Sequence, residues 1–330
     1  MIPAVMRASA KSILVGIDEA GYGPILGPLV VSAAAFEVPT AALDDCLWQK
    51  LRRSVSNTTT ARRARIAILD SKLLYRRKVG LAPLERSVLA VLAAWRGLPA
   101  TMRPLLGLLC PDALGELADY PWYDGADPTL PRSADAAIVR IAGGLLASDL
   151  AEHDLRLAGC YAEVLAEGHY NRLVEKTRNK SVALFGLVLR LIHRIARAYP
   201  RHPLRIVVDK QGARSRYGPL LMRAFADRHL RIISETAEQS SYAMSAGDSS
   251  WRISFEQSGE SKHLPVALAS LFSKYLREIL MGCFNEYWSR QVTDLKPTAG
   301  YYQDGLRFLQ DIQEQVRRLK LSRDTLVRQR

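Results

Sequence analysis

Residues 13–36, ILVGIDEAGYGPILGPLVVSAAAF, contain two apolar runs joined by a bend rich in glycine and proline. The first run ends in two adjacent acids, Asp18 and Glu19. Apolar, β-branched runs separated by Gly and Pro are typical of a β-hairpin. Alternate side chains of a strand point to opposite faces, so Asp18 shares its face with apolar neighbours such as Leu14. The stretch therefore predicts a hairpin with an acid on an otherwise apolar sheet face.

The acid pair needs a special backbone if both carboxylates are to serve one site. An ionised carboxylate on an apolar face is costly unless a cation, hydrogen-bond donors or water reach it. Glu19 points away from Asp18 on a regular strand, so the two converge only if the chain leaves strand geometry. Gly21 and Gly23, on either side of Tyr22, permit that change because glycine tolerates dihedrals closed to other residues. Two interpretations of the acid pair remain: a turn whose acids are merely solvated, and a binding site that both carboxylates share.

Residues 16–24 (GIDEAGYGP) and 27–31 (GPLVV) resemble the signature hairpin of the type 2 ribonucleases H, the ribonuclease HII and HIII family. The resemblance implies a ribonuclease H-like α/β fold, with a mixed β-sheet flanked by helices. It also implies a metal-dependent endoribonuclease whose remaining acidic ligands come from distant parts of the chain.

Asp209 is the candidate for the third acid. Residues 204–208 (LRIVV) predict a short buried strand, and Asp209 follows it directly. Open α/β sheets place their sites at such strand ends. Strand termination explains an Asp there equally well, and it is the family resemblance that makes Asp209 a ligand.

Glu260 is the candidate for the fourth acid, at the point where a strand predicted over 251–256 gives way to a helix. Residues 259–275 resemble the ribonuclease HIII form of the fourth-ligand motif, although Ser258 stands where a lysine is common. Ser261 is the expected helix cap. Glu278 lies further along the same helix and is the lower-ranked alternative; it also suits a surface ion pair with Lys274, four residues earlier.

Several residues are candidates for contacts with nucleic acid. Residues 70–72 resemble the family's Asp-Ser-Lys motif, which puts Lys72 near a phosphate, although an ordinary helix cap at Asp70 or Ser71 explains the triplet too. Lys262 and Tyr301 are further candidates, the latter because Gly300-Tyr301 is similar to a family pair whose ring packs on a sugar. A turn and a packing tyrosine explain that pair equally well.

The resemblance also implies that backbone groups of the Gly21–Gly23 turn reach the ribose 2′-hydroxyl, the group that distinguishes RNA from DNA. Ribonuclease HII has arginine where this chain has Tyr22. Cleavage of RNA–DNA hybrids remains the expectation. Because of this difference, the sequence leaves open whether a single embedded ribonucleotide is cleaved.

The composition fits a protein with a large core, and its basic charge favours a polyanionic partner, although a merely soluble basic protein would carry the same charge. The chain has 330 residues, 48% of them hydrophobic, and a formal net charge of +13. The four cysteines are widely spaced, without the spacing of a zinc site or a disulfide framework, which predicts a reducing compartment. No signal peptide or membrane span is expected, so the predicted location is the cytoplasm.

The predicted catalytic domain comprises residues 12–94 and 151–305. Residues 95–150 contain six scattered prolines and predict an irregular insertion without long helices. Its aromatic cluster at 120–123 suits packing against the host domain better than stacking on bases. A long helix is expected over 171–199 and a helix over 214–229, and residues 306–330 predict a solvated basic helix or tail.

The resulting hypothesis is a hydrolase for the RNA strand of RNA–DNA hybrids, with Asp18, Glu19, Asp209 and Glu260 as catalytic ligands of two Mg2+ or Mn2+ ions. Two such ions activate water and stabilise the leaving oxygen without a covalent protein nucleophile. Two alternatives remain: a nuclease of the same fold for another nucleic acid, and a nucleic-acid-binding protein without catalysis. Protein partners and self-association are not predicted.

Overall fold

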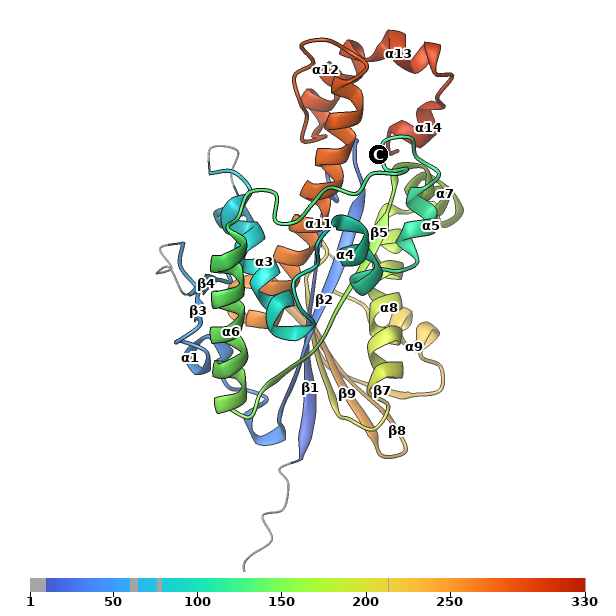
Figure 1. Ribbon diagram of the computed structural model, residues 1–330. Helices are drawn as coiled ribbons and strands as arrows, with labels where there is room; N and C mark the ends of the chain where they lie inside the picture. The colour runs from blue at the N-terminus through green and yellow to red at the C-terminus, as the bar shows by residue number, and fades with distance from the viewer. Residues whose placement is uncertain (1–9, 60–64, 76–78, 213, 330) are drawn as a thin grey trace, which may run out of the picture.

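The computed structural model describes residues 10–59, 65–75, 79–212 and 214–329. Its centre is a seven-stranded mixed β-sheet with strand order β5-β2-β1-β6-β9-β8-β7 (Figure 1). The strands are β1 (Lys11–Ala20), β2 (Leu29–Pro39), β5 (Arg156–Leu165), β6 (Leu204–Asp209), β7 (His229–Glu235), β8 (Gln239–Ala246) and β9 (Ser249–Glu256). A separate parallel pair is formed by β3 (Val55–Ser56) and β4 (Ile66–Ala67). The mixed α/β architecture is as predicted.

The predicted hairpin is present as the antiparallel pair of β1 and β2. Side chains of β1 alternate as expected: Ile13, Val15 and Ile17 join the core on one face of the sheet, and Leu14 joins the core on the other. On its second edge β1 pairs in parallel with β6, which in turn pairs in parallel with β9. The carboxyl ends of three adjacent strands therefore meet at one edge of the sheet.

Helices cover both faces of the sheet (Figure 1). One face packs against α11 (Leu264–Ser289), with α3 (Ala82–Trp95) and α6 (Ala136–Glu152) outside it. The other face packs against α8 (Lys180–Ala198) and α9 (Gly218–Ala224). The remaining helices are α1 (Leu47–Lys50), α2 (Ser71–Leu74), α4 (Met102–Leu109), α5 (Ala113–Leu117), α7 (Glu167–Thr177), α10 (Gly259–Lys262), α12 (Tyr302–Asp311), α13 (Gln313–Arg318) and α14 (Arg323–Leu326).

The long helix predicted over 171–199 is wrong in one respect, because the chain forms two helices there. Arg178 ends α7 in the left-handed conformation, with φ of 52°. Asn179 then starts α8, its side chain accepting a hydrogen bond from the Ser181 amide at 2.9 Å. The prediction from apolar spacing did not detect the helix cap at Asn179. Over 214–229 only α9 is helical.

Residues 95–150 are less irregular than predicted. The 17-residue helix α6 follows the last proline of the segment, Pro131, so the prolines do not interrupt it. Trp122 is buried and packs edge-on against Phe284 at 5.4 Å between ring centroids and near Trp288. The aromatic cluster thus packs on α11, the alternative favoured from the sequence.

The C-terminal segment is also not a single solvated helix. It forms three short helices, and Phe308, Ile312 and Leu326 are buried in the same core cluster as the apolar residues of α11. Arg328, one of its basic residues, is only 3% exposed. Arg330 lies outside the described residues. None of the described helices combines the length and apolar character needed to cross a bilayer.

Candidate active site

The four predicted acids come together at the sheet edge where parallel strands end. Asp18 and Glu19 are near the end of β1, and Asp209 ends β6 beside them. Glu260 lies in α10, which directly follows the end of β9. All four line one cleft of about 220 Å3.

Backbone contacts hold this arrangement. The Asp209 Oδ1 atom accepts a hydrogen bond from the Gly259 amide at 2.8 Å, which ties β6 to the start of α10. The Asp18 Oδ1 atom accepts from the Glu19 amide at 2.7 Å. The Glu260 Oε2 atom is buried and has no hydrogen-bond partner among the described residues. The helix cap predicted at Ser261 is wrong. Ser261 lies inside α10, and the residue at the N-cap of α10 is Ser258.

The ionised forms of Asp18, Glu19 and Asp209 are disfavoured by burial and mutual repulsion. Burial, the Asp18 charge and Glu260 raise the pKa of Asp209 to about 8. Burial and the Asp209 charge raise the pKa of Glu19 to about 7, against the opposing effect of Lys72. Burial and the Glu19 charge raise the pKa of Asp18 well above its usual range. A bound cation would remove this penalty, and perturbed carboxyl groups in a cleft indicate a functional site.

The glycine turn forms one wall of the cleft, which Gly21, Tyr22 and Gly23 all line. Gly21 has φ of +90°, and a Cβ atom there would lie 2.6 Å from the Pro28 oxygen. A side chain at this position is therefore excluded both by backbone conformation and by space.

Three basic side chains also contribute to the cleft. Lys72, Lys274 and Arg277 all line it. Asp70 caps α2, because its side chain accepts a hydrogen bond from the Lys72 amide at 2.9 Å. The helix cap considered as the alternative is therefore present, and Lys72 lines the cleft as well.

Sequence reasoning missed the contribution of α11. Ser270, Lys274 and Arg277 line the cleft, and Ser273 donates a hydrogen bond to the Asp18 carbonyl at 2.9 Å. These four residues are spaced i, i+3, i+4 and i+7 and so share one helix face. A polar stripe in an otherwise apolar helix was the signal available for finding them.

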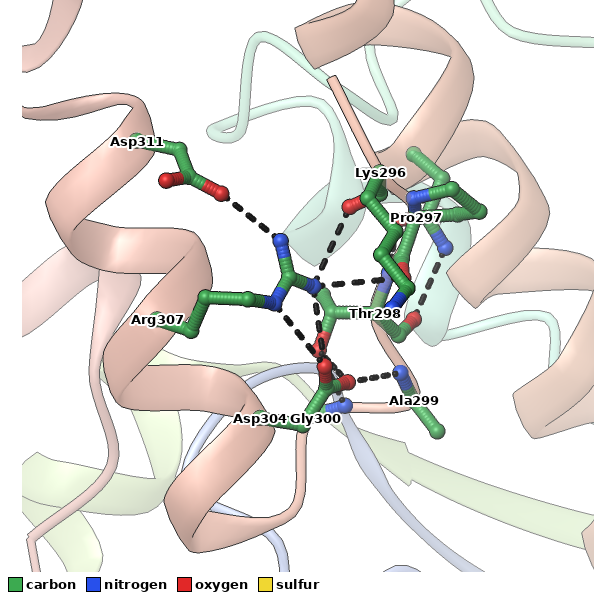
Figure 2. Close-up of polar contacts among 9 residues, drawn as sticks. Lys296, Pro297, Thr298, Ala299, Gly300, Asp304, Arg307 and Asp311 are labelled. Atoms are coloured by element: carbon green, nitrogen blue, oxygen red, sulfur yellow. Dashed lines mark hydrogen bonds and ion pairs between the residues drawn. The ribbon is translucent and has the colours of Figure 1, made fainter.

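Tyr301 also reaches the cleft, and a polar network fixes the loop before it (Figure 2). Asp304 accepts from the Thr298 hydroxyl at 2.7 Å, and that hydroxyl accepts from the Gly300 amide at 2.9 Å. Arg307 donates to the Lys296 carbonyl at 3.1 Å. The Gly300 carbonyl in turn accepts from the Ile25 amide at 2.8 Å, which joins this loop to the hairpin.

Two predicted residues lie outside the cleft lining. Lys262 is exposed and donates to the Gln257 carbonyl at 2.9 Å. Glu278 pairs with Lys274 at 2.7 Å, the ion pair expected from their spacing. Of the two competing acids, Glu260 is therefore the one that faces the other three carboxylates.

The carboxylates of the cleft are candidate ligands for a divalent cation. No group of three or more His, Cys, Asp or Glu side chains that could hold a metal ion is present in the described part of the chain. Mg2+, however, is ordinarily held by one or two carboxylates, waters and substrate phosphates rather than by a complete protein cage. The crowded, buried oxygens and the orphaned Glu260 Oε2 atom are compatible with that mode of binding.

The comparisons with known proteins give fold neighbours only. No family model and no curated protein sequence matches the chain. Solved structures similar to it are type 2 ribonucleases H. One is the ribonuclease HII of Archaeoglobus fulgidus in complex with PCNA, with 16% identity, a TM-score of 0.44, and 96% of this chain and 94% of that chain covered.

Two further neighbours are of the same kind. Bst-RNase HIII in complex with Mn2+ has 16% identity and a TM-score of 0.43, with 99% of this chain and 70% of that chain covered. The ribonuclease H2 of Pyrococcus horikoshii OT3 has 15% identity and a TM-score of 0.39, with 95% and 92% covered. Identities this low assign no activity, so the function is argued from the cleft.

Proposed function

We propose that this chain is a divalent-metal-dependent endonuclease that hydrolyses the RNA strand of RNA–DNA hybrids. The observation that carries the proposal is the cleft in which Asp18, Glu19, Asp209 and Glu260, contributed by three separate segments, face a glycine turn and basic side chains. The sequence resemblance of the hairpin to type 2 ribonucleases H points to the same chemistry.

The acids are proposed to hold Mg2+ or Mn2+ ions, two of them when substrate is bound. When bound, such ions supply an activated water and stabilise the charge of the leaving oxygen. The protein contributes carboxylates that are already desolvated and grouped before the ion arrives. The backbone bond from Gly259 to Asp209 keeps the third acid facing the first.

The basic residues are proposed to position the phosphodiester backbone. Lys72 lies close enough to Glu19 to lower its pKa, so a phosphate bound at the acids would lie near this ammonium group. Lys262 lies outside the cleft and remains a candidate contact for a more distant phosphate. The net charge of +13 favours association with any nucleic acid.

Selection of RNA is proposed to depend on the glycine turn. A Cβ atom at Gly23 would meet nothing within 4 Å, so the absence of a side chain there leaves room for a sugar to approach the backbone. Tyr22 and Tyr301 both line the same cleft and offer rings against a sugar or base. Lys180 lies over the Tyr22 ring at 5.3 Å, so this ring already carries a cation beside it.

The test is cleavage of end-labelled duplexes of one sequence: an RNA–DNA hybrid, a DNA duplex, and a DNA duplex with one ribonucleotide. Wild type is expected to cut the hybrid's RNA strand with Mg2+ or Mn2+ and to be inactive in EDTA. Asp18→Asn is expected to abolish cutting. Asp248→Asn is the matched control, because Asp248 is exposed in the turn before β9, at the end of that strand opposite the cleft.

Each outcome discriminates among the functions. Cutting of the DNA duplex in preference to the hybrid would replace the proposal with a nuclease for another nucleic acid. Equal behaviour of wild type and Asp18→Asn on all substrates would exclude catalysis at this cleft and leave a binding protein.

A further inference from the structure

The C-terminal end of the chain contacts the glycine turn through a buried arginine. Arg328 donates hydrogen bonds to the carbonyls of Gly21 and Pro24, and its own amide donates to the Ile25 carbonyl at 2.8 Å. Its guanidinium group lies over the Tyr170 ring at 4.9 Å from the ring centroid. Arg328, which is more than 300 positions away in sequence, is thus bonded directly to the wall of the cleft.

The segment around Arg328 is anchored through its backbone to α7. The Asn171 amide nitrogen donates to the carbonyls of Asp324 and Val327, both at 2.8 Å, and its Oδ1 atom accepts from the Gln329 amide at 2.7 Å. Figure 1 shows α14 beside α7. One buried asparagine therefore holds the segment on both sides of Arg328.

The turn is held from its other side by a second buried arginine. Arg277 of α11 donates to the carbonyls of Pro28 at 2.6 Å and Leu26 at 3.1 Å. Glu167, completely buried, accepts from the Gly27 amide at 2.9 Å and interacts electrostatically with both arginines. Four carbonyls of the turn therefore point at guanidinium groups rather than into the cleft: those of Gly21, Pro24, Leu26 and Pro28.

Peptide geometry gives this arrangement a consequence for the cleft. In a trans peptide the N–H of one residue points opposite to the preceding C=O. Because the Gly21 carbonyl points at Arg328, the Tyr22 N–H points away from it, and this N–H finds no acceptor among the described residues. Fixing the carbonyl thus fixes a donor of a residue that lines the cleft.

We propose that Arg328 is a positioning residue: the docked C-terminal segment 322–329 holds the glycine turn in the orientation that presents its backbone donors to the substrate. This inference rests on the proposed nuclease function for its kinetic consequence, but its structural part does not require activity.

The experiment compares full-length Arg328→Met and Arg328→Lys with Arg323→Met. Arg323 is exposed in the same segment, so Arg323→Met removes the same charge without touching the turn. Backbone hydrogen exchange over residues 20–28 is measured by mass spectrometry, with residues 204–208 as the internal reference. Hybrid cleavage then gives kcat and KM, with and without added guanidinium ion.

Arg328→Met is expected to speed exchange over residues 20–28 while leaving 204–208 protected. It is expected to lower kcat on the order of tenfold with little change in KM, as for other residues that orient an active-site group. Guanidinium ion is expected to restore part of the loss, Arg328→Lys to be intermediate, and Arg323→Met to match wild type.

Unchanged exchange over residues 20–28 in Arg328→Met would overturn the proposal, whatever the activity. If Arg328→Met does not fold, Arg328→Lys is judged by the same criterion, and failure of both to fold would make Arg328 a folding residue instead. A wild type that cuts no hybrid would reject the nuclease function, whereas the exchange result would still decide the positioning role.

Discussion

At the scale of single residues, the candidate site is a group of carboxylates that the folded protein makes difficult to ionise. Asp209 and Glu19 have pKa values raised to about 8 and about 7. A raised carboxyl pKa in the folded state means that the native protein holds more protons than the unfolded chain. The free energy of unfolding therefore decreases as pH rises from about 4 towards 8, because ionising these groups costs more in the folded protein than in the unfolded chain.

Asp209→Asn is expected to stabilise the metal-free protein at pH 8, by on the order of 1 kcal/mol, while abolishing cleavage. Asparagine keeps an oxygen for the Gly259 amide and removes the repulsion with Asp18. The stabilisation should shrink as pH falls towards 5, because Asp209 is then protonated in wild type. Urea unfolding in EDTA at pH 5 and pH 8 measures it.

Asp248→Asn is the control, because this exposed residue lies away from the cleft. A stability difference between wild type and Asp209→Asn that does not change with pH would contradict the assigned charge repulsion.

Lys72→Ala is expected to weaken hybrid binding and to reduce the slope of log affinity against log salt by about 1, as for one lost phosphate contact. The measurement is a binding titration at several salt concentrations in an Asp18→Asn background, which prevents cleavage. Lys262→Ala is the matched comparison, and a smaller effect is expected because Lys262 lies outside the cleft lining. Equal losses from both variants would remove the special role of Lys72.

At the scale of elements, α11 is the support on which the acid-bearing strand lies. Gly16 of β1 is in direct contact with the start of this helix: a Cβ atom there would lie 2.1 Å from the backbone of Pro265. The same helix supplies Ser273 to the Asp18 carbonyl and Arg277 to the glycine turn. The close approach of helix and strand therefore sets the position of the first acid.

Gly16→Ala is expected to destabilise the protein by about 1–3 kcal/mol, because the backbone of β1 or α11 must move to admit the methyl group. Gly186→Ala in α8 is the control: a Cβ atom there meets nothing within 4 Å, and alanine is the better helix former. Urea denaturation compares the two. Equal stability of Gly16→Ala and wild type would show that the helix and strand are less closely packed than described.

Elements with strong local signals were predictable, and those decided by a single residue were not. The hairpin of β1 and β2 and the buried strand β6 follow from apolar runs bounded by turn residues. The break between α7 and α8 depends on Arg178 adopting positive φ, which apolar periodicity does not record. Helix α6 was not predicted because the six prolines were taken to exclude long helices over all of 95–150. The last of them is Pro131, and α6 begins after it.

At the scale of the whole molecule, binding of a divalent cation should couple to global stability. A ligand that binds only the folded state stabilises it by mass action, by about 2.7 kcal/mol at one hundred times its dissociation constant. Mg2+ or Mn2+ is therefore expected to raise the melting temperature by a few degrees at pH 8. At pH 5.5 the rise should be smaller, because protons compete for Asp209 and Glu19, whose pKa values are raised.

Thermal melts with Mg2+, Mn2+ or EDTA at both pH values test this coupling. Asp18→Asn is expected to lose most of the rise and Asp248→Asn none of it. An equal rise in Asp18→Asn and wild type would place cation binding elsewhere on the molecule.

The sequence alone determined the hairpin, the strand that ends at Asp209 and the four candidate acids, because local periodicity, turn residues and a family resemblance all act within short stretches. The tertiary structure decided which groups surround those acids. Arg277 comes from a stripe on α11, and Arg328 comes from a tail predicted to be solvated. Burial of a charged side chain depends on partners brought from distant parts of the chain, and no local pattern encodes them.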